Sequence, residues 1–367
     1  MIFAKDLPNW FSEPGAYVLV DGQYGSTGKG VMAAILAEVG RGRITHVTTN
    51  AGPNSGHTAY WPLGPDDGTN WEKIVTQQIP VASVFLEKMG EKVTTYINAG
   101  AIIDQEILAR EVKAWFNNHA AHKRIVINPC AAVINDADRI LDAVVVNSVA
   151  GTGKGVGPAI QRKIGREGVQ NGRVLYWPML PTDRSEDHSF DRFWDWNKDV
   201  VLVETAQGFS LGLNTARFAP YTTSRECTVA QAISDARIPP QKVRKVVACF
   251  RTFPIRVGFA PNGASSGDCY EDQVETSWEA IGVEPEITTV TKRVRRVFTW
   301  SRRQFMDCVA ANEPDVLFIN MANYMKKSEY MALVDQCVED YVSVLGHGPD
   351  AIIAGHSAHH EDAELVY

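Results

Sequence analysis

Several features that would assign this 367-residue chain to a common class are missing from its sequence. Its six cysteines form no CxxC pair, which argues against a disulfide framework or a zinc site and favours reduced thiols. A net charge of −7 offers no excess of positive charge for a general nucleic-acid-binding surface. No apolar run is long enough to span a bilayer, and the first residues lack the pattern of a signal peptide. We therefore expect a cytoplasmic protein that binds neither membranes nor nucleic acid directly.

The sequence also lacks a fixed-period repeat, and instead short β-branched runs alternate with helix-like stretches. The expected strands are Tyr17–Val20, Val93–Asn98, Arg124–Ile127, Val200–Glu204, Lys245–Phe250, Val316–Ile319 and Ala351–Ala354. The expected helices include Val31–Val39, Gln105–Asn117 and Ser328–Leu345. Segments rich in Gly, Pro, Ser or Asn are expected to be functional loops: Gly40–Asn54, Gly151–Asn171 and Pro254–Asp272. This alternation predicts an α/β fold with a mainly parallel central sheet flanked by helices, in a single domain spanning residues 1–367.

A glycine-rich loop follows the first expected strand and leads into a helix. Its glycines are Gly22, Gly25, Gly28 and Gly30. They let backbone N–H groups converge on an anion, and the helix N-terminus adds a partial positive charge. Lys29 can reach a transferring phosphate. The loop departs from the Walker pattern, because Gln23 stands at the first glycine position and Gly30 replaces the Mg²⁺-binding hydroxyl. The sequence thus predicts a P-loop-like phosphate site unlike that of a typical GTPase or kinase.

Further polar clusters follow in chain order, and each has a plainer alternative. A lone histidine is usually structural, but the glycines around His57 suggest a close backbone approach to a ligand and a role as general acid. Residues 151–158, followed by Arg166, are either a solvated surface loop or a second anion site. Gln207 follows a strand, where α/β proteins place ligand groups. Residues 286–296 are either a solvated face or a site for a small carboxylate.

Taken together and in order, these clusters resemble the adenylosuccinate synthetase family from Gly22 to about Ser357. The loop from Gln23 to Gly30 is similar to the family's Gln-Trp-Gly-Asp-Glu-Gly-Lys-Gly, and residues 54–58 resemble its Asn-Ala-Gly-His-Thr. Residues 204–208 resemble its Glu-Gly-Ala-Gln-Gly. The resemblance implies an adenylosuccinate synthetase-like fold and a carbon–nitrogen ligase. A nucleoside triphosphate would phosphorylate the 6-oxygen of a purine monophosphate, and the amine of L-aspartate would then displace phosphate.

The resemblance also implies roles for individual residues. The catalytic residues would be Ser26, Lys29, His57 and Gln207. The phosphate loop would comprise Gln23, Gly25, Ser26, Thr27, Gly28, Lys29 and Gly30, with Gly56, His57 and Thr58. The monophosphate would be held by Asn54, Gly151, Thr152, Gln207, Thr223 and Val257, and by Arg166 from the partner subunit of a homodimer. Aspartate would be held by Thr289, Thr291, Arg293 and Arg295, and Mg²⁺ by Ser26 and Gly56. The base of the triphosphate would lie near Asn320, Asn323 and Gly355.

Two departures from the family pattern bear on the substrates. Ser26 replaces the family's loop aspartate, its catalytic base, and so frees volume beside the purine's 2-position. Short phage-type homologues, the 2-aminoadenylosuccinate synthetases, show this kind of replacement and accept dGMP. An asparagine, Asn323 or with a shifted register Asn320, stands where the family reads guanine with an aspartate, and this favours ATP or dATP over GTP. Asp21 stands where the family commonly has glycine, and is either a restored carboxylate or a turn residue.

The first interpretation is therefore a synthetase that joins aspartate to C6 of dGMP, giving 2-amino-2′-deoxy-N⁶-succinyladenylate for diaminopurine DNA. If the enzyme is phage-encoded, it would act in the host cell cytoplasm. Two alternatives stay open. One is an ordinary adenylosuccinate synthetase that acts on IMP. The other is a nucleotide-binding regulator that lost catalysis together with the loop aspartate.

Overall fold

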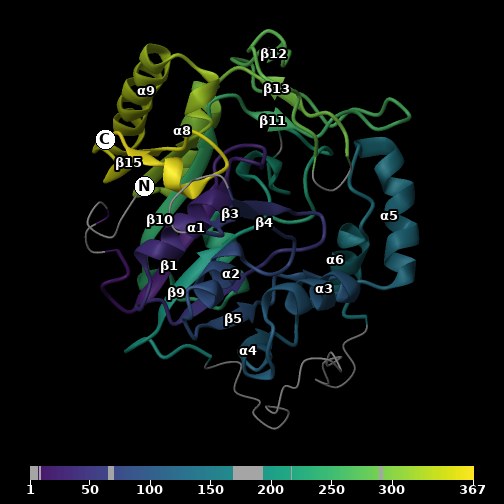
Figure 1. The fold of residues 1–367 in the computed structure, drawn as a ribbon. Helices are drawn as coiled ribbons and strands as arrows, with labels where there is room; N and C mark the ends of the chain where they lie inside the picture. Colours follow the sequence, from purple (N-terminus) through teal and green to yellow (C-terminus); the bar gives the residue numbers. More distant parts are fainter. Residues whose placement is uncertain (1–6, 8–9, 65–69, 168–192, 216, 289–291) are drawn as a thin grey trace.

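The structure is a computed structural model of the chain, and it describes residues 7, 10–64, 70–167, 193–215, 217–288 and 292–367. A nine-stranded sheet runs through its centre (Figure 1), in the order β16-β15-β14-β10-β1-β9-β2-β5-β7. In that order the strands are Glu364–Leu365, Ala351–Ala354, Val316–Asn320, Val243–Arg251, Gly15–Asp21, Val200–Glu204, His46–Thr49, Thr94–Ile97 and Ile125–Ile127. Every pairing is parallel except that of β16 with β15.

Helices cover both faces of this sheet, which explains why its central strands are apolar on both sides. Along β1, Tyr17 and Leu19 face one core, and Ala16, Val18 and Val20 face the other. The first core is covered by α1 (Lys29–Val39), α2 (Val81–Lys88), α3 (Gln105–Trp115) and α4 (His119–His122). The second is covered by α7 (Val229–Asp235), α8 (Arg302–Asn312) and α9 (Lys327–Leu345). Two separate cores therefore hold the sheet rigid from both sides.

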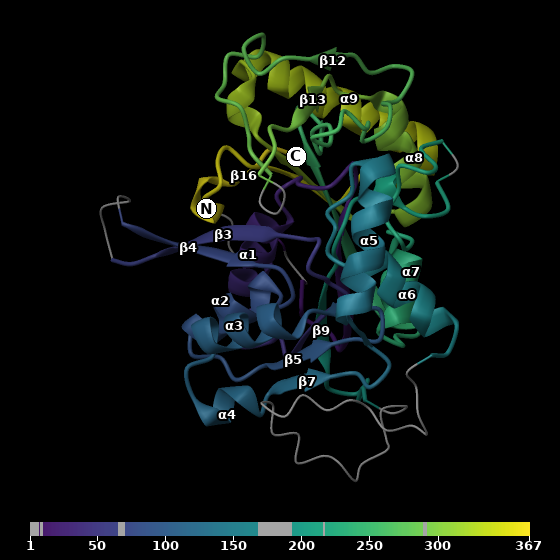
Figure 2. The same cartoon turned by 90° about the vertical axis from the view of Figure 1, so that its right-hand side faces the viewer.

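Smaller elements lie around the rim of the central sheet (Figure 2). The hairpin β3–β4 joins His57–Pro62 to Trp71–Thr76. A short parallel pair joins β6 (Ile102–Ile103) to β8 (Ala132–Val133). A three-stranded antiparallel sheet joins β11 (Ile255–Arg256), β13 (Arg296–Phe298) and β12 (Glu275–Thr276). Helices α5 (Asp136–Val149) and α6 (Val156–Ile164) pack on each other at the periphery, and short 3₁₀ turns occupy Phe209–Leu211, Pro240–Lys242, Ala322–Tyr324 and His360–Asp362.

All seven expected strands and the three expected helices are confirmed, with ends that differ by a few residues. All three expected loops contain regular structure, which in segment 254–272 is the two-residue strand β11. Segment 40–54 contains β2, whose single aliphatic residue Val47 gave little strand signal but which is buried between β9 and β5. Segment 151–171 contains α6, whose glycines and Pro158 resembled a loop, although proline is tolerated in the first helical turn. In the described residues no helix is long and apolar enough to cross a membrane.

Candidate active site

The predicted clusters meet at one edge of the sheet, because the carboxyl ends of its parallel strands lie there together. Asp21 ends β1, and its neighbours β9 and β10 end at Glu204 and Arg251. Asn320 ends β14, next to β10, and Asn50 follows β2, next to β9. Open α/β sheets bind ligands at this edge. Residues that are far apart in the sequence therefore share one site.

Asp21 organises the phosphate loop. One carboxylate oxygen accepts hydrogen bonds from the backbone N–H groups of Gln23, at 2.9 Å, and Gly25, at 3.1 Å. The other accepts from the Thr27 hydroxyl at 2.6 Å and the Lys29 ammonium at 2.8 Å. Asp21 and Lys29 are 1% and 4% exposed, so this is a buried ion pair. Asp21 thus acts as the strand-end turn residue that the sequence suggested, and its carboxylate is also paired with Lys29.

Close backbone packing fixes the position of the loop. The Gln23 side-chain amide pairs with the backbone N–H and carbonyl of Arg251 at 3.0 and 3.2 Å. Gly28 has a φ of 95° and caps α1, and a Cβ there would lie 2.2 Å from the Asn320 amide nitrogen. A Cβ on Gly208 would lie 2.1 Å from the backbone nitrogen of Gly25. These positions need glycine for conformation or for contact, so the loop is held in one shape before any phosphate arrives.

His57 is oriented by a buried carboxylate. Its Nδ1 lies 2.6 Å from Glu204, which is fully buried. Glu204 also accepts the backbone N–H groups of Val81 and Ala82, each at 3.1 Å, at the N-terminus of α2. A helix N-terminus favours a negative charge, so Glu204 stays available to accept from Nδ1–H. This leaves Nε2 as the ring nitrogen that can meet a reacting group.

Ser26 is exposed and is contacted by cations instead of carrying a charge itself. Its hydroxyl oxygen accepts a hydrogen bond from Arg295 at 2.7 Å, and its backbone carbonyl accepts one from Arg251 at 3.2 Å. Glu286 pairs with Arg251 and accepts from the Tyr324 hydroxyl at 3.1 Å. Burial lowers the pKa of Arg295 to about 10. Burial alone would raise the pKa of Glu286, but the guanidinium groups hold it below its ordinary value.

Two of the predicted monophosphate residues have buried side-chain atoms for which the described chain offers no partner. The Asn54 carbonyl oxygen and the Gln207 amide nitrogen are buried without a hydrogen-bond partner among the described residues. Gly151, Thr152, Thr223 and Val257 are half-buried. Arg166 is exposed at the far end of α6, roughly 15 Å from the start of that helix at 1.5 Å per residue. The predicted monophosphate residues are thus buried or half-buried in this chain, whereas Arg166 is exposed beyond the end of α6.

The structure describes some, but not all, of the residues predicted to bind aspartate and the base of the triphosphate. Thr289 and Thr291 lie outside the described residues. Arg293 donates its backbone N–H to Thr288 at 2.9 Å and has a buried guanidinium nitrogen without a described partner. Asn320 is 1% exposed and accepts from the Met321 backbone at 2.8 Å. It is packed against Gly28 and Gly355, beside the phosphate loop.

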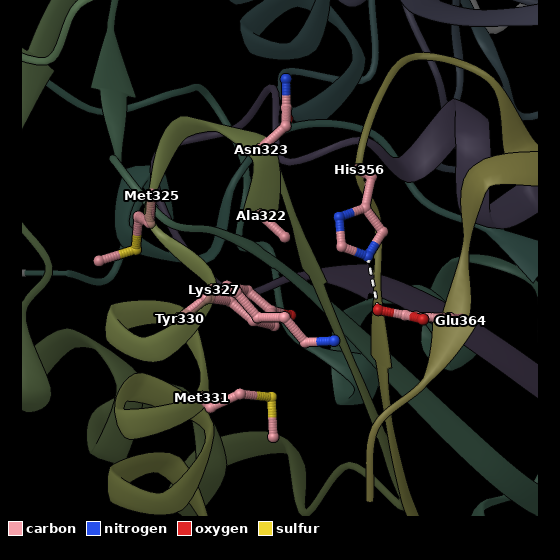
Figure 3. A pocket seen from close by; sticks show the side chains of 8 residues that line it. All are labelled: Ala322, Asn323, Met325, Lys327, Tyr330, Met331, His356 and Glu364. Atoms are coloured by element: carbon pink, nitrogen blue, oxygen red, sulfur yellow. Dashed lines mark hydrogen bonds and ion pairs between the residues drawn. The ribbon is translucent and has the colours of Figure 1, made fainter.

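Asn323, in contrast, lies at a cavity of about 270 Å³ (Figure 3). The lining residues are Ala322, Asn323, Met325, Lys327, Tyr330, Met331, His356 and Glu364. His356 and Glu364 pair at 2.8 Å on one side, and the Asn323 amide points away from them. Of the two asparagines, Asn323 is thus the one with an accessible amide.

Comparison with known proteins identifies the fold and the family. A family model described as adenylosuccinate synthetase matches residues 18–192 and 191–334. The chain belongs to the adenylosuccinate synthetase family. It is thereby a carbon–nitrogen ligase by class, as the sequence predicted.

Relatives in this family differ in the substrates that their names give. The N6-succino-2-amino-2′-deoxyadenylate synthase of Salmonella phage PMBT28 is 35% identical over 88% of this chain and 89% of its own. The structure of the cyanophage S-2L succinoaminodeoxyadenylate synthetase, bound to dGMP and dATP, has a TM-score of 0.76 and 27% identity, and covers 96% of this chain and 95% of that one. The Plasmodium falciparum adenylosuccinate synthetase has a TM-score of 0.73 at 16% identity, covering 96% of this chain and all of that one, and shows the shared fold alone.

Sequence reasoning missed some residues of this adenylosuccinate synthetase site. Glu204 was part of a quoted motif, but its role became visible only when β3 brought His57 to the end of β9. Glu286 and Tyr324 join the arginine cluster through contacts that span 35 and 38 residues. No local spacing signals such pairs. The one hint in the sequence was that Glu204 ends an expected strand and that glycines flank His57.

Proposed function

We propose that this chain joins L-aspartate to C6 of dGMP at the expense of ATP or dATP, and releases 2-amino-2′-deoxy-N⁶-succinyladenylate, the nucleoside diphosphate and phosphate. The observation that carries the choice of dGMP is the 2.7 Å hydrogen bond from Arg295 to the Ser26 hydroxyl. Ser26 is a small neutral residue at the position where the family has an aspartate, and a guanidinium, not a carboxylate, lies beside it. The names of the phage relatives support the same choice.

In the first step the 6-oxygen of dGMP attacks the γ-phosphorus of the donor, the bond to the β-phosphate oxygen breaks with release of the nucleoside diphosphate, and the N1 proton passes to solvent. Lys29, which Asp21 holds in the loop, would stabilise the charge of the transferring phosphoryl group together with the loop amides that Asp21 does not engage. Gln207 is suited to orient the 6-oxygen, because its buried amide nitrogen has no partner in the described chain. His57, oriented by Glu204, donates a hydrogen bond to the phosphoryl group from Nε2.

In the second step the amine of aspartate attacks C6, and the C6–O bond breaks with release of phosphate. Arg293 and Arg295 supply the positive charge that a dicarboxylate substrate requires, and Thr289 and Thr291 precede them in the sequence. Glu286 keeps both Arg251 and Arg295 near Ser26. Aspartate is thereby bound next to the purine edge that Ser26 faces.

We propose Mg²⁺ as the cofactor. No group of three His, Cys, Asp or Glu side chains in the described parts of the chain is arranged to hold a metal. Mg²⁺ commonly takes only one or two protein oxygens, with phosphates and water completing its shell. The exposed Ser26 and Gly56 can supply these, as a hydroxyl and a backbone carbonyl. When bound, the ion would neutralise charge on the donor phosphates.

We propose a homodimer in which Arg166 completes the partner's monophosphate site. Its exposure beyond the end of α6 supports this role. Apolar side chains on the same pair of helices are also exposed, namely Ile140, Leu141 and Val144 on α5 and Ile164 on α6. An isologous interface there would bury them. Mixing inactive Arg166→Ala and Lys29→Ala chains should restore activity, and no recovery after confirmed subunit exchange would contradict a shared site.

The main experiment measures aspartate-dependent phosphate release with IMP, GMP and dGMP against ATP, dATP and GTP. Turnover with dGMP and ATP or dATP is expected. Turnover with IMP instead would identify an ordinary adenylosuccinate synthetase. Tight binding of dGMP without turnover would identify a regulator. We propose that the reaction takes place in the cytoplasm of a phage-infected host, since the relatives named N6-succino-2-amino-2′-deoxyadenylate synthase are phage proteins.

A further inference from the structure

Arg225 is a buried cation whose hydrogen-bonding capacity is only partly used. Its side chain is 8% exposed. Nη1 donates to the backbone carbonyls of Asn50 and of Gly100, the latter at 2.8 Å. Nε and Nη2 find no acceptor among the described residues. A guanidinium has five N–H groups, so three of them remain unused.

The unused side of the guanidinium is the one that binds oxyanions. Nε–H and the adjacent Nη2–H are parallel donors, the arrangement that grips a carboxylate or a phosphate in a fork. The compensation available from the protein is weak. Burial lowers the pKa of Arg225, and attraction to Asp235 offsets this only in part. Asp235 itself accepts hydrogen bonds from Asn50 at 2.9 Å and Gln231 at 2.7 Å.

Arg225 also lies among the predicted monophosphate residues. It follows Thr223 and Ser224, and a Cβ on Gly157 in the first turn of α6 would lie 3.1 Å from the Ser224 hydroxyl. Through the Asn50 carbonyl it holds the start of the segment that carries Asn54. The Asn50 side chain in turn accepts the backbone N–H of Ala206, next to Gln207, at 3.1 Å. Asn50 thus links Arg225 to the backbone beside Gln207, four residues before Asn54 in the chain.

We infer that Arg225 binds the 5′-phosphate of the purine monophosphate through its Nε–Nη2 edge, from within the same subunit. The inference rests on the proposed function and adds to it a residue that binds the 5′-phosphate. The phosphate would supply the oxygens that the buried donors lack, and the charge that the cation lacks. The monophosphate site would then keep one cation of its own subunit in addition to Arg166 of the partner.

A double-mutant cycle between protein and ligand tests this. Dissociation constants are measured for dGMP and for 2′-deoxyguanosine, which lacks only the phosphate, in the parent, Arg225→Met, Arg225→Lys and Arg162→Met. Arg162 is the matched control, since it lies on α6 and is already paired with Asp138 at 2.7 Å. In the parent the phosphate should strengthen binding. In Arg225→Met that gain should shrink about 10- to 100-fold, as for loss of hydrogen bonds to a charged group. In Arg162→Met it should stay unchanged.

Arg225→Lys keeps the charge and loses the fork, so its gain should fall between those of the parent and Arg225→Met. It also keeps the test valid if Arg225→Met does not fold. Equal weakening of both ligands in Arg225→Met would mean that Arg225 only ties Asn50 to Gly100, and would overturn the inference. So would an unchanged gain in Arg225→Lys, or a rise in the KM of the triphosphate alone. Failure of the parent to turn over dGMP would count against the proposed function, which these binding ratios do not measure.

Discussion

Around the phosphate loop the carboxylate of Asp21 accepts four hydrogen bonds from the protein itself, whereas across the site Asn54, Gln207 and Arg225 keep buried atoms without described partners. Both regions lie at the same sheet edge and both are polar. A buried polar group without a partner costs about 1–3 kcal/mol. The contacts of Asp21 therefore hold the loop itself, although Arg251, Arg295 and Asn320 beside it also keep a buried nitrogen without a described partner. The monophosphate side gains partners when a ligand supplies oxygens and N–H groups. Stability should be more sensitive to mutation on the first side, and substrate affinity on the second.

Lys29→Met should give the largest effect, because it removes the cation of the ion pair that holds the phosphate loop. Phosphate release should fall by at least about 10³-fold, because the main positive charge facing the phosphoryl group is lost. The variant should also lose about 3–5 kcal/mol of stability, since Asp21 would be left buried and unpaired. Denaturant unfolding and steady-state rates check both. Asp21→Asn/Lys29→Met, as the control, should regain stability without regaining activity. If Lys29→Met unfolds like the parent, the ion pair does not stabilise the loop.

His57→Gln should lower kcat by about 10²–10³-fold, as expected for loss of a general acid. Glu204→Gln should lower it less, by about 10–100-fold, because the imidazole remains but is no longer oriented. The KM of dGMP should change little in either variant, since neither side chain lies among the orphaned groups. Combining the two mutations should cost no more than His57→Gln alone. Additive losses would show that Glu204 acts independently of His57.

For a physical reason, the sequence was informative about the phosphate loop, where Asp21 is paired. Lys29, Gly28 and Asp21 lie within nine residues of one another, so a loop, its lysine and its helix can be recognised together. Gln207 could be assigned to a site because it follows an expected strand, and parallel strands bring their carboxyl ends to one edge.

The partners of the other side could not be predicted, because they depend on packing between distant segments. Arg225 meets Asn50 across 175 residues, and Arg295 meets Ser26 across 269. In the sequence, Arg225 appeared only as the residue after a run of hydroxyls. Burial decided its importance, and no pattern of neighbours shows that an arginine will be 8% exposed.

Ser26→Asp tests the boundary between the phosphate loop and the monophosphate side of the site. The φ of Ser26 is 57°, a conformation that aspartate tolerates, so the loop should keep its shape. A carboxylate would pair with Arg295 and crowd the 2-amino group of dGMP, lowering kcat/KM by up to about 100-fold, since overpacking costs about 1–3 kcal/mol. Some use of IMP should appear. Ser26→Ala, the control, removes the hydrogen bond without adding volume and should keep most dGMP activity. Undiminished turnover of dGMP by Ser26→Asp would refute the volume argument.

The smallest effect is expected at the triphosphate base, where Asn323 can both donate and accept. Adenine requires both, whereas the N1–H and 2-amino edge of guanine requires acceptors only. One mismatched buried group costs about 1–3 kcal/mol, so the parent should prefer ATP to GTP by about one to two factors of ten. Asn323→Asp should narrow or reverse this preference and leave the KM of dGMP nearly unchanged.

Asn320→Asp is the matched comparison for Asn323→Asp. Asn320 is packed between Gly28 and Gly355, so a change there should disturb the phosphate loop and lower activity with both donors alike. Values of kcat/KM for ATP and GTP in the parent and both variants decide the matter. A parent that prefers GTP would contradict the assignment outright. A switch of preference seen only in Asn320→Asp would move the base to the buried asparagine, and would mean that the exposed amide at the cavity does not read the donor.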